Sequence, residues 1–173
     1  MDDPVPFASR WYFCLLLLLL VSRGMDFLST WIATPNLVLE GNPIAKKLGW
    51  KWGIPFNLAL SFGFASWPFA AIVISTTSVL VAARNFQSAW LMRSMGEYPY
   101  REWHVERLRE TRLALYLSCL FAQTVLTAGV GAAIILFSDW LVPMSIGFGI
   151  VCYAVVVAFY TLLATWRLRR ASA

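Results

Sequence analysis

The sequence contains few charged residues and a single histidine. Charged side chains make up 13% of the 173 residues, whereas a soluble domain carries about 25%. One histidine excludes a zinc site built from several histidines and the histidine pair of zinc proteases. A phosphate-binding loop and the Gly-x-Ser-x-Gly motif of serine hydrolases are also missing from the sequence. We therefore expect no metal and no cofactor.

Cysteine is also rare, and its positions carry no motif. Cys14, Cys119 and Cys152 all fall inside apolar segments and lack Cys-x-x-Cys spacing. We interpret them as small buried hydrophobic residues, which indicate nothing about the redox compartment.

Long uncharged segments are abundant instead. Hydrophobic residues make up 60% of the chain, and the mean hydropathy is +0.66. Residues 54–83, 113–138 and 140–166 are free of charge, and each stretch exceeds the roughly 20 residues needed to cross a bilayer. Such stretches are too long to be buried core helices of a soluble protein. The sequence therefore predicts an all-α, polytopic membrane protein.

The first apolar segment can cross a membrane only if it includes two charged residues. Residues 11–22 would form about 18 Å of helix, which is too short to span a bilayer. A helix over residues 11–33 is long enough, and Pro35 disfavours helix at the residue before it. This span places Arg23 and Asp26 slightly past its midpoint. Because no small-x-small cleavage site follows, we interpret it as an uncleaved first helix.

These segments predict one membrane domain, a four-helix bundle with a long polar loop at residues 84–112. The second half of this loop, residues 100–112, should form one or two charged helical turns that run directly into the third span. The expected spans are residues 11–33, 54–83, 113–137 and 141–166. Pro68 should bend the second span, and residues 35–53 should form the first loop.

Positive charge sets the expected orientation of this bundle. Four crossings put both termini on one side. The 84–112 loop holds six arginines and the C-terminal tail, which includes Arg169 and Arg170, holds three. The positive-inside rule therefore places both termini in the cytoplasm. Three lysines in the first loop count against this orientation without reversing it.

The formal net charge of +5 does not indicate nucleic-acid binding. The arginines stand at the ends of apolar segments, where they anchor helices at the lipid surface, and they are not gathered on a soluble face. Glu102, Glu106 and Glu110 repeat every four residues on one helical face. That face is either solvated and ion-paired, or a docking surface for a cytoplasmic partner or for anionic head groups. The expected partners are the lipid bilayer and either a second copy or another membrane protein.

Small and polar residues within the spans suggest helix contacts. Two pairs have the small-xxx-small spacing that lets backbones approach closely: Ala59 with Gly63, and Gly129 with Ala133. Gln123, together with Thr124 and Thr127, forms a polar patch in the third span. This patch either makes interhelical hydrogen bonds or lines a path.

One polar face stands out in the first span. Arg23 and Asp26 are three residues apart and share a helix face, and Thr30 extends that face by one turn. The pair is interpreted in three ways: an internal salt bridge that fixes the first helix to a neighbour, an interfacial pair in a broken helix, or a functional site. In a functional site Asp26 would bind a proton or a cation, with Arg23 as its counter-ion or as an anion clamp.

A second polar group follows in the first loop. Glu40 and Asn42 belong to a Glu-Gly-Asn-Pro turn, which by itself indicates a solvated loop. If the loop folds back, the Glu40 carboxylate and the Asn42 amide could join Asp26 to bind a hard cation or to share a proton. The spacing alone does not bring these groups together. The candidate binding residues are Arg23, Asp26, Thr30, Glu40 and Asn42.

These residues also carry a resemblance. The stretch Asp26-x-x-Ser29-Thr30 followed by Glu40-x-Asn42-Pro43 resembles the signature of an uncharacterised family of small prokaryotic multi-pass membrane proteins. In that family an Asp-x-x-x-Thr in the first helix precedes a Glu-x-Asn-Pro turn. The resemblance covers roughly residues 23–45. It implies a prokaryotic plasma (inner) membrane protein and a place for a site, but no chemistry.

Three functions remain open from the sequence. The first and best supported is a non-catalytic accessory or interaction subunit, because the chain is small and has no large soluble domain. The second is a transporter or channel for a small ion or polar solute that uses Arg23 and Asp26. The third is an intramembrane enzyme that uses Asp26 and Glu40, and it has the least support because no nucleophile or ligand set is complete.

Overall fold

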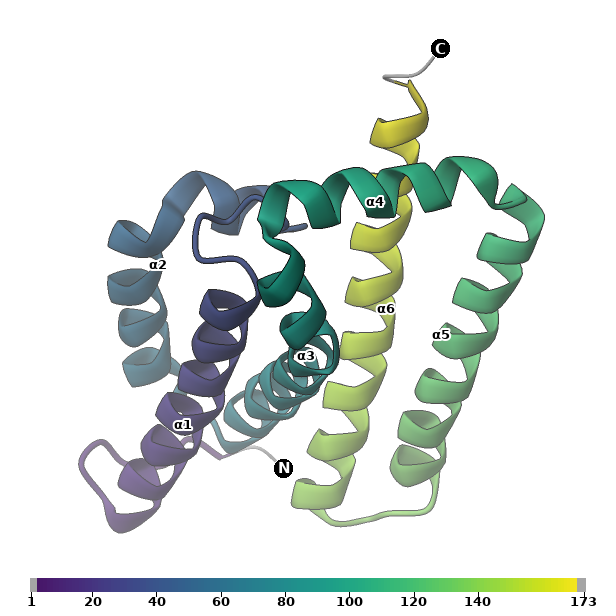
Figure 1. Ribbon diagram of the computed structural model, residues 1–173. Helices are drawn as coiled ribbons and strands as arrows, with labels where there is room; N and C mark the ends of the chain where they lie inside the picture. Colours follow the sequence, from purple (N-terminus) through teal and green to yellow (C-terminus); the bar gives the residue numbers. More distant parts are fainter. Residues whose placement is uncertain (1–2, 171–173) are drawn as a thin grey trace.

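The computed structural model describes residues 3–170, except for the side chains of residues 168–170. Over these residues the chain forms six α-helices and no strand (Figure 1). The helices are α1 (Arg10–Ala33), α2 (Pro43–Phe64), α3 (Pro68–Met95), α4 (Glu97–Glu110), α5 (Leu113–Leu136) and α6 (Leu141–Arg170). Four of them, α1, α3, α5 and α6, are long and apolar enough to cross a membrane. The prediction of an all-α chain with four helices of spanning length is confirmed, and these are the properties of a multi-pass membrane protein.

Three of the predicted helices agree closely with the structure. Helix α1 begins where the Ser9 hydroxyl accepts a hydrogen bond from the backbone N–H of Tyr12 at 3.2 Å, and it ends at Ala33, two residues before Pro35. Helix α5 ends within one residue of its predicted bound. Helix α6 continues past the predicted end at residue 166 to Arg170. The side chains of Arg169 and Arg170, predicted to anchor this end, lie outside the described part of the chain.

The predicted second span, residues 54–83, is wrong. The chain instead ends α2 at Phe64, turns, and begins α3 at Pro68. Trp67 is extended (φ −115°, ψ 100°), as expected for a residue before proline, and Pro68 occupies the first turn of the new helix, where its missing N–H costs nothing. A single straight helix of that length would reach about 45 Å, well beyond the roughly 30 Å hydrocarbon core.

The two predicted loops contain more helix than the sequence indicated, although helical turns were expected within residues 100–112. The first loop, residues 35–53, gives way to α2 at Pro43, and this helix is interrupted at Gly49, whose φ of 61° suits glycine. The predicted loop over residues 84–112 holds the end of α3 and all of α4. These two helices are separated at Gly96, which has a φ of 85°.

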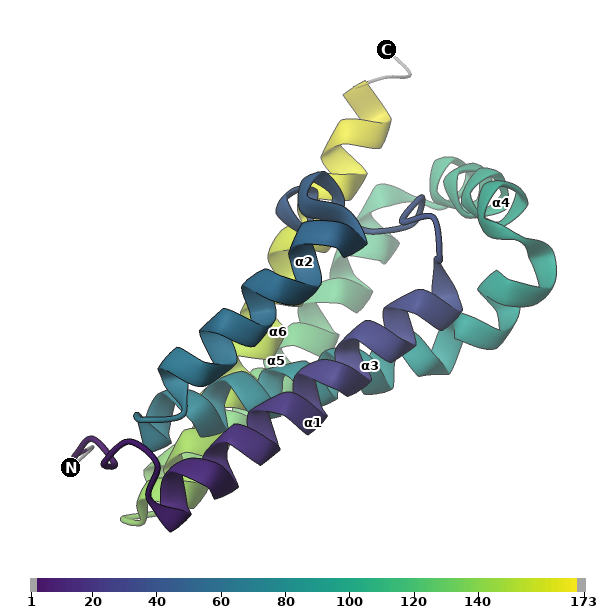
Figure 2. The ribbon, with the colours of Figure 1, turned by 90° about the vertical axis from the view of Figure 1, so that its left-hand side faces the viewer.

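Helix α2 runs antiparallel to α1, and the turn over residues 65–67 then makes α3 run parallel to α1. The backbone N–H of Val5, just before α1, donates to the carbonyl of Ser66 at 2.8 Å. The Tyr12 hydroxyl donates to the carbonyl of Phe62 at 3.1 Å. The start of α1 therefore lies beside the end of α2, and α3 then returns alongside α1 (Figure 2). As a result, α1 begins and α6 ends at opposite ends of the bundle (Figure 1). This arrangement does not fit the prediction that both termini lie on one side.

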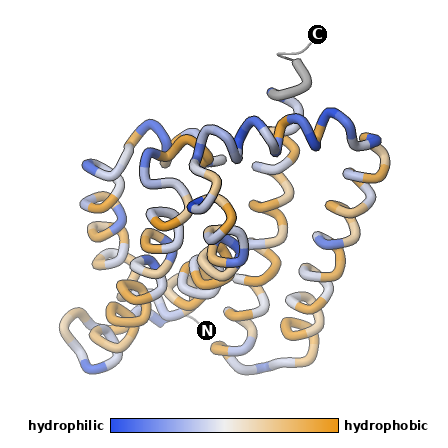
Figure 3. Tube along the Cα trace, viewed as in Figure 1, coloured by the Kyte–Doolittle hydropathy of each residue, from blue (hydrophilic) through white to orange (hydrophobic). Residues whose placement is uncertain are grey.

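Hydrophilic residues gather at one end of this bundle. Helix α4 lies across that end and joins α3 to α5 (Figures 1 and 3). The first half of α2 and the last turns of α6 lie at the same end. We call it the charged end, and its basic residues include Lys46, Lys47, Lys51, Arg93, Arg101, Arg107, Arg109 and Arg112. The opposite end holds the α2–α3 turn and the α5–α6 connection.

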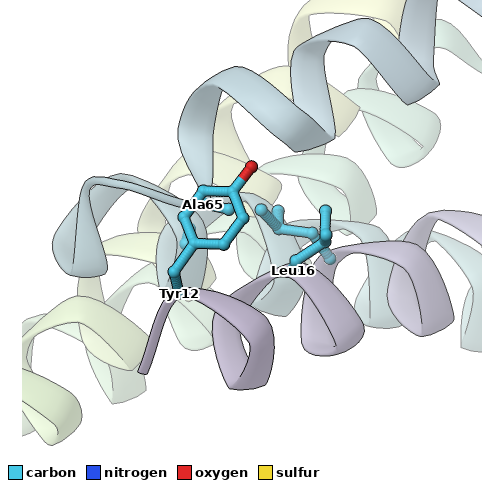
Figure 4. Close-up of a cluster of buried hydrophobic side chains, with 5 residues drawn as sticks. Tyr12, Leu16 and Ala65 are labelled. Atoms are coloured by element: carbon cyan, nitrogen blue, oxygen red, sulfur yellow. The ribbon is translucent and has the colours of Figure 1, made fainter. Parts of the chain in front are cut away.

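A row of small residues joins α3 to the rest of the bundle. Its members are buried, recur at steps of three, four or seven residues, and face the packed interior: Ala71, Ser75, Ser78, Ala82 and Ala89. Small side chains let helix backbones approach closely, and α1 contributes buried Ser22 and Ser29. Near the start of α1, Tyr12 and Leu16 pack beside Ala65 of the α2–α3 turn (Figure 4).

The small-residue pairs predicted from the sequence make no close contact within the chain. A Cβ placed on Gly63 or Gly129 would meet nothing within 4 Å. The close contact is elsewhere, because a Cβ on Gly131 of α5 would lie 2.7 Å from the carbonyl oxygen of Gly147 on α6, and the reverse distance is also 2.7 Å. Gly149 faces α3, where a Cβ would lie 2.6 Å from Cβ of Thr76.

The prediction that the cysteines are buried is also wrong. Cys14, Cys119 and Cys152 are free thiols exposed on the outer faces of their helices. Their apolar neighbours on these faces are exposed as well. An apolar segment of a membrane protein can face lipid as well as protein, so hydropathy does not reveal which face is packed.

Candidate functional site

Arg23 and Asp26 lie where α1 meets α2 and α3. The Arg23 Nη1 donates to Asp26 Oδ2 at 3.0 Å and to the Ser78 hydroxyl of α3 at 3.1 Å. The Arg23 Nη2 donates to the side-chain oxygen of Asn57 on α2. We call these four residues the Arg23 cluster. One guanidinium thus joins three helices, and the predicted pairing of Arg23 with Asp26 is present.

The neighbours of this cluster hold its side chains in place. The Asn57 amide nitrogen donates to the carbonyl of Gly53 one turn earlier, at 2.8 Å, which turns its oxygen toward Arg23. The Arg23 guanidinium also lies 5.8 Å from the centre of the Phe27 ring, a cation–π distance. Trp50 packs against the same ring and donates to the carbonyl of Pro35 at 2.8 Å.

The Arg23 cluster is mostly shielded from solvent. The Arg23 side chain is 28% exposed and that of Asp26 is 19% exposed. A lone charge near the centre of a membrane helix costs about 2.5–3.5 kcal/mol on insertion scales. Opposite charges at 3.0 Å, with added neutral hydrogen-bond partners, offset much of that cost. The arrangement is therefore one that keeps two charges inside a bundle.

Thr30 joins a neighbouring polar contact on α1. The Asn85 amide of α3 donates to the hydroxyls of Ser29 and Thr30, at 3.3 Å in each case. The Ser29 hydroxyl donates to the carbonyl of Asp26 at 2.9 Å. The polar face predicted from the sequence therefore faces α3, and Asn85 is a partner that the sequence did not identify.

Asn42 caps the start of α2. Its side-chain oxygen accepts hydrogen bonds from the backbone N–H groups of Ile44 and Ala45, at 2.9 and 3.4 Å, so Asn42 is the N-cap of α2. These bonds use the oxygen that a shared pocket with Asp26 would need.

Glu40 makes its hydrogen bond within its own turn. Its carboxylate accepts from the backbone N–H of Asn42 at 2.7 Å. Burial raises the pKa of Glu40 above its ordinary value, although the N–H groups of Asn42 and Gly41 and the charge of Lys46 oppose that change. Glu40 thus stabilises its own turn, and no bond joins it to Asp26 among the described residues.

Glu97 is the functional candidate that sequence reasoning missed. Its buried carboxylate accepts four hydrogen bonds from the loop after α1: from the Thr34 hydroxyl at 2.6 Å, the Asn36 backbone and side-chain nitrogens at 2.9 Å each, and the Val38 N–H at 3.1 Å. Burial alone would raise the pKa of Glu97, but these hydrogen bonds outweigh it and the pKa is lowered. No local signal could have revealed this Glu97 site, because its partners lie about sixty residues away.

Other polar surfaces are more open. A shallow groove runs along the exposed side of α4, and it is lined by Pro99, Arg101, Glu102, Trp103, Val105, Glu106 and Arg109. Within residues 3–170, no group of three or more His, Cys, Asp or Glu side chains is arranged to hold a metal ion.

The chain matches no protein-family model, no curated protein and no solved structure. The resemblance noted for residues 23–45 is therefore a likeness of short motifs.

Proposed function

We propose that this protein is a non-catalytic component of a membrane, which holds α4 at the membrane surface for a partner protein to bind. The observation that carries the proposal is that the charged groups of the interior serve to join helices. Arg23 bonds to α2, to α3 and to its own helix, and Glu97 bonds the start of α4 to the loop after α1. Groups engaged in this way stabilise the fold.

The position of α4 supports binding by a protein. A single residue, Gly96, connects α4 to α3, and two residues connect it to α5. Because α3 and α5 are candidate spans, α4 must lie close to the membrane surface. Its groove is lined by two acids, Glu102 and Glu106, two arginines, Arg101 and Arg109, and Trp103. Charges of both signs together with an aromatic ring suit a polar protein surface with complementary charges.

The distribution of basic residues supports an orientation with the charged end in the cytoplasm. In the structure, the three lysines of α2 lie at the same end as α4, so they no longer oppose the arginines in the positive-inside rule. The C-terminus would then be cytoplasmic, with the N-terminus on the other side. The resemblance noted above favours the plasma membrane of a prokaryote.

Site-specific photo-crosslinking in growing cells tests the function. We expect a photoreactive residue in place of Glu102 to cross-link the protein to one partner. The same residue in place of Glu106 should give an adduct of the same mass. The matched control is Val79, which is exposed on α3 away from the groove. An adduct that forms equally from Val79, or no adduct from either α4 position, would overturn the proposal.

A second candidate is the binding of a proton or small cation at Asp26. It is favoured by the partial exposure of the Asp26 side chain, which is 19% exposed beside its counter-ion Arg23. Proton or cation uptake into vesicles containing the purified protein would test it. Uptake that is lost in Asp26→Asn, in a protein that remains folded, would favour this function over the first.

A further inference from the structure

Helix α2 contacts the rest of the bundle along one narrow side. After the break at Gly49, that side is formed by residues at steps of four: Gly53, Asn57 and Ser61. Gly53 lies against the Phe27 ring of α1, and Asn57 accepts the hydrogen bond from Arg23. The other sides of this part of α2 hold apolar side chains that are between 40% and 53% exposed: Ile54, Phe56, Leu58, Leu60 and Phe62. Most of α2 therefore faces away from the protein.

The start of α2 carries positive charge that the chain does not balance. Three lysines are exposed there, and we call them the α2 lysines: Lys46, Lys47 and Lys51. The sequence has no acidic residue between Glu40 and Glu97, and both of these carboxylates accept hydrogen bonds from the segment that joins α1 to α2. Within the described part of the chain, none of the α2 lysines makes an ion pair. The α2 lysines therefore suit an anionic partner.

Charged, aromatic and apolar side chains follow one another along α2. The Lys51 Nζ lies 5.9 Å from the centre of the Trp52 ring, and this ring is 63% exposed. Tryptophan is enriched at the level of the lipid headgroups. From Lys51 to Phe62 the helix extends about 16 Å, which is close to half of the roughly 30 Å hydrocarbon core. The order and the length match those of one phospholipid, with its headgroup at the charged end and its acyl chains in one leaflet.

We infer that α2 binds a phospholipid with a negatively charged headgroup in the leaflet at the charged end. The α2 lysines hold the phosphate, and the acyl chains lie along the exposed apolar side of α2. A zwitterionic phospholipid carries the same phosphate, but its own cationic group repels the lysines, so a lipid with net negative charge binds better. This inference goes beyond the proposed function and does not depend on it.

Native mass spectrometry of the purified protein in a neutral detergent tests the inference. Phosphatidylglycerol and phosphatidylcholine with identical acyl chains are added in equal amounts. We expect the phosphatidylglycerol adduct to be favoured about tenfold, which corresponds to one or two lysines acting on the headgroup. Changing all three α2 lysines to glutamine should reduce this preference to within about twofold. Changing all three to arginine should keep it, because the charge remains.

A matched variant separates a site on α2 from a general effect of charge. Changing Arg93, Arg101 and Arg112 to glutamine removes the same charge from other exposed positions at the charged end, and it should leave the preference near tenfold. Circular dichroism should give the same helical content for every variant, because the altered side chains are exposed.

Three results would overturn the inference. Equal binding of both lipids by the unchanged protein would mean that α2 does not select a negative headgroup. An equal loss of preference in the lysine and arginine variants would mean that net charge alone attracts the lipid. Displacement of phosphatidylglycerol by an excess of inorganic phosphate would mean that a free anion is the occupant. These measurements use the purified protein, so they can fail while the α4 adducts form in cells, and the reverse also holds.

Discussion

Neutralising one member of the Arg23–Asp26 pair should destabilise the protein more than neutralising both. In Asp26→Asn, Arg23 keeps its charge but loses the carboxylate at 3.0 Å. An unpaired charge near the centre of a membrane helix costs about 2.5–3.5 kcal/mol. The Asn side chain can still accept one neutral hydrogen bond, so we expect a loss of about 2 to 3 kcal/mol. Arg23→Gln should cost a similar amount, because it leaves the Asp26 carboxylate without its cation.

The double variant Arg23→Gln with Asp26→Asn contains no charge at this position. Its new Gln amide can donate to Asn57 or to Ser78, so one link from α1 to a neighbouring helix is kept. Replacing both members of a buried ion pair is often nearly neutral. We therefore expect the double variant to lie within about 1 kcal/mol of the unchanged protein. This is far less than the sum of the two single variants, which is the mark of coupled residues.

The assay is SDS-induced unfolding of the purified protein in detergent, followed by far-ultraviolet circular dichroism. An Asp26→Asn variant as stable as the unchanged protein would refute the reasoning, because Asp26 would then contribute nothing to the fold. A double variant that loses the sum of the two single effects would also refute it, since the two residues would then act independently.

Three further predictions concern packing, pH and orientation. Gly131→Ala should lower the free energy of unfolding by about 1–3 kcal/mol, because its Cβ would press on the carbonyl of Gly147. Gly129→Ala should change this free energy by less than about 0.5 kcal/mol, because a Cβ there meets nothing within 4 Å. SDS unfolding of both variants checks the difference. The stabilisation from Glu97 should be complete above its ordinary pKa of 4.5 and should be lost as the pH falls below that value, because folding lowers this pKa. Thermal unfolding from pH 7 to pH 3 should therefore depend on pH less steeply in Glu97→Gln, which should also lose about 2 kcal/mol at pH 7; equal slopes would contradict the site. Reporter tags should place the N-terminus and the C-terminus on opposite sides, and tags on a common side would mean that α2 and α3 do not both pass along the bundle.

The sequence predicted helices where apolar runs are bounded by charge or proline. Helices α1, α5 and α6 meet that condition, and their predicted bounds agree with the structure to within a few residues. The α2–α3 turn does not meet it, because Ala65 and Trp67 are apolar and hydropathy continues through them. Two signals were available: the apolar run is half again as long as a span requires, and Pro68 lies near its middle.

The candidate site was predictable only in its local part. Arg23 and Asp26 share a face by their spacing alone. Asn57, Ser78 and Asn85 could not be assigned, because their positions depend on how α2 and α3 turn. The burial of Ser75 and Ser78 was not predicted because serine is a polar residue. The regular spacing of the small residues in α3 could nevertheless have been recognised.

The three-residue turn before Pro68 also has a consequence for how the chain enters its membrane. Helix α2 carries three lysines and is not among the helices that are apolar enough to cross independently. It lies along the bundle as one limb of a hairpin with α3, and its basic start is at the charged end. The hairpin therefore determines whether the chain passes along the bundle an odd or an even number of times. A mutation that straightened the turn would reverse the sidedness of everything after it, so that a local change of a few backbone angles would deliver α4 to the wrong compartment.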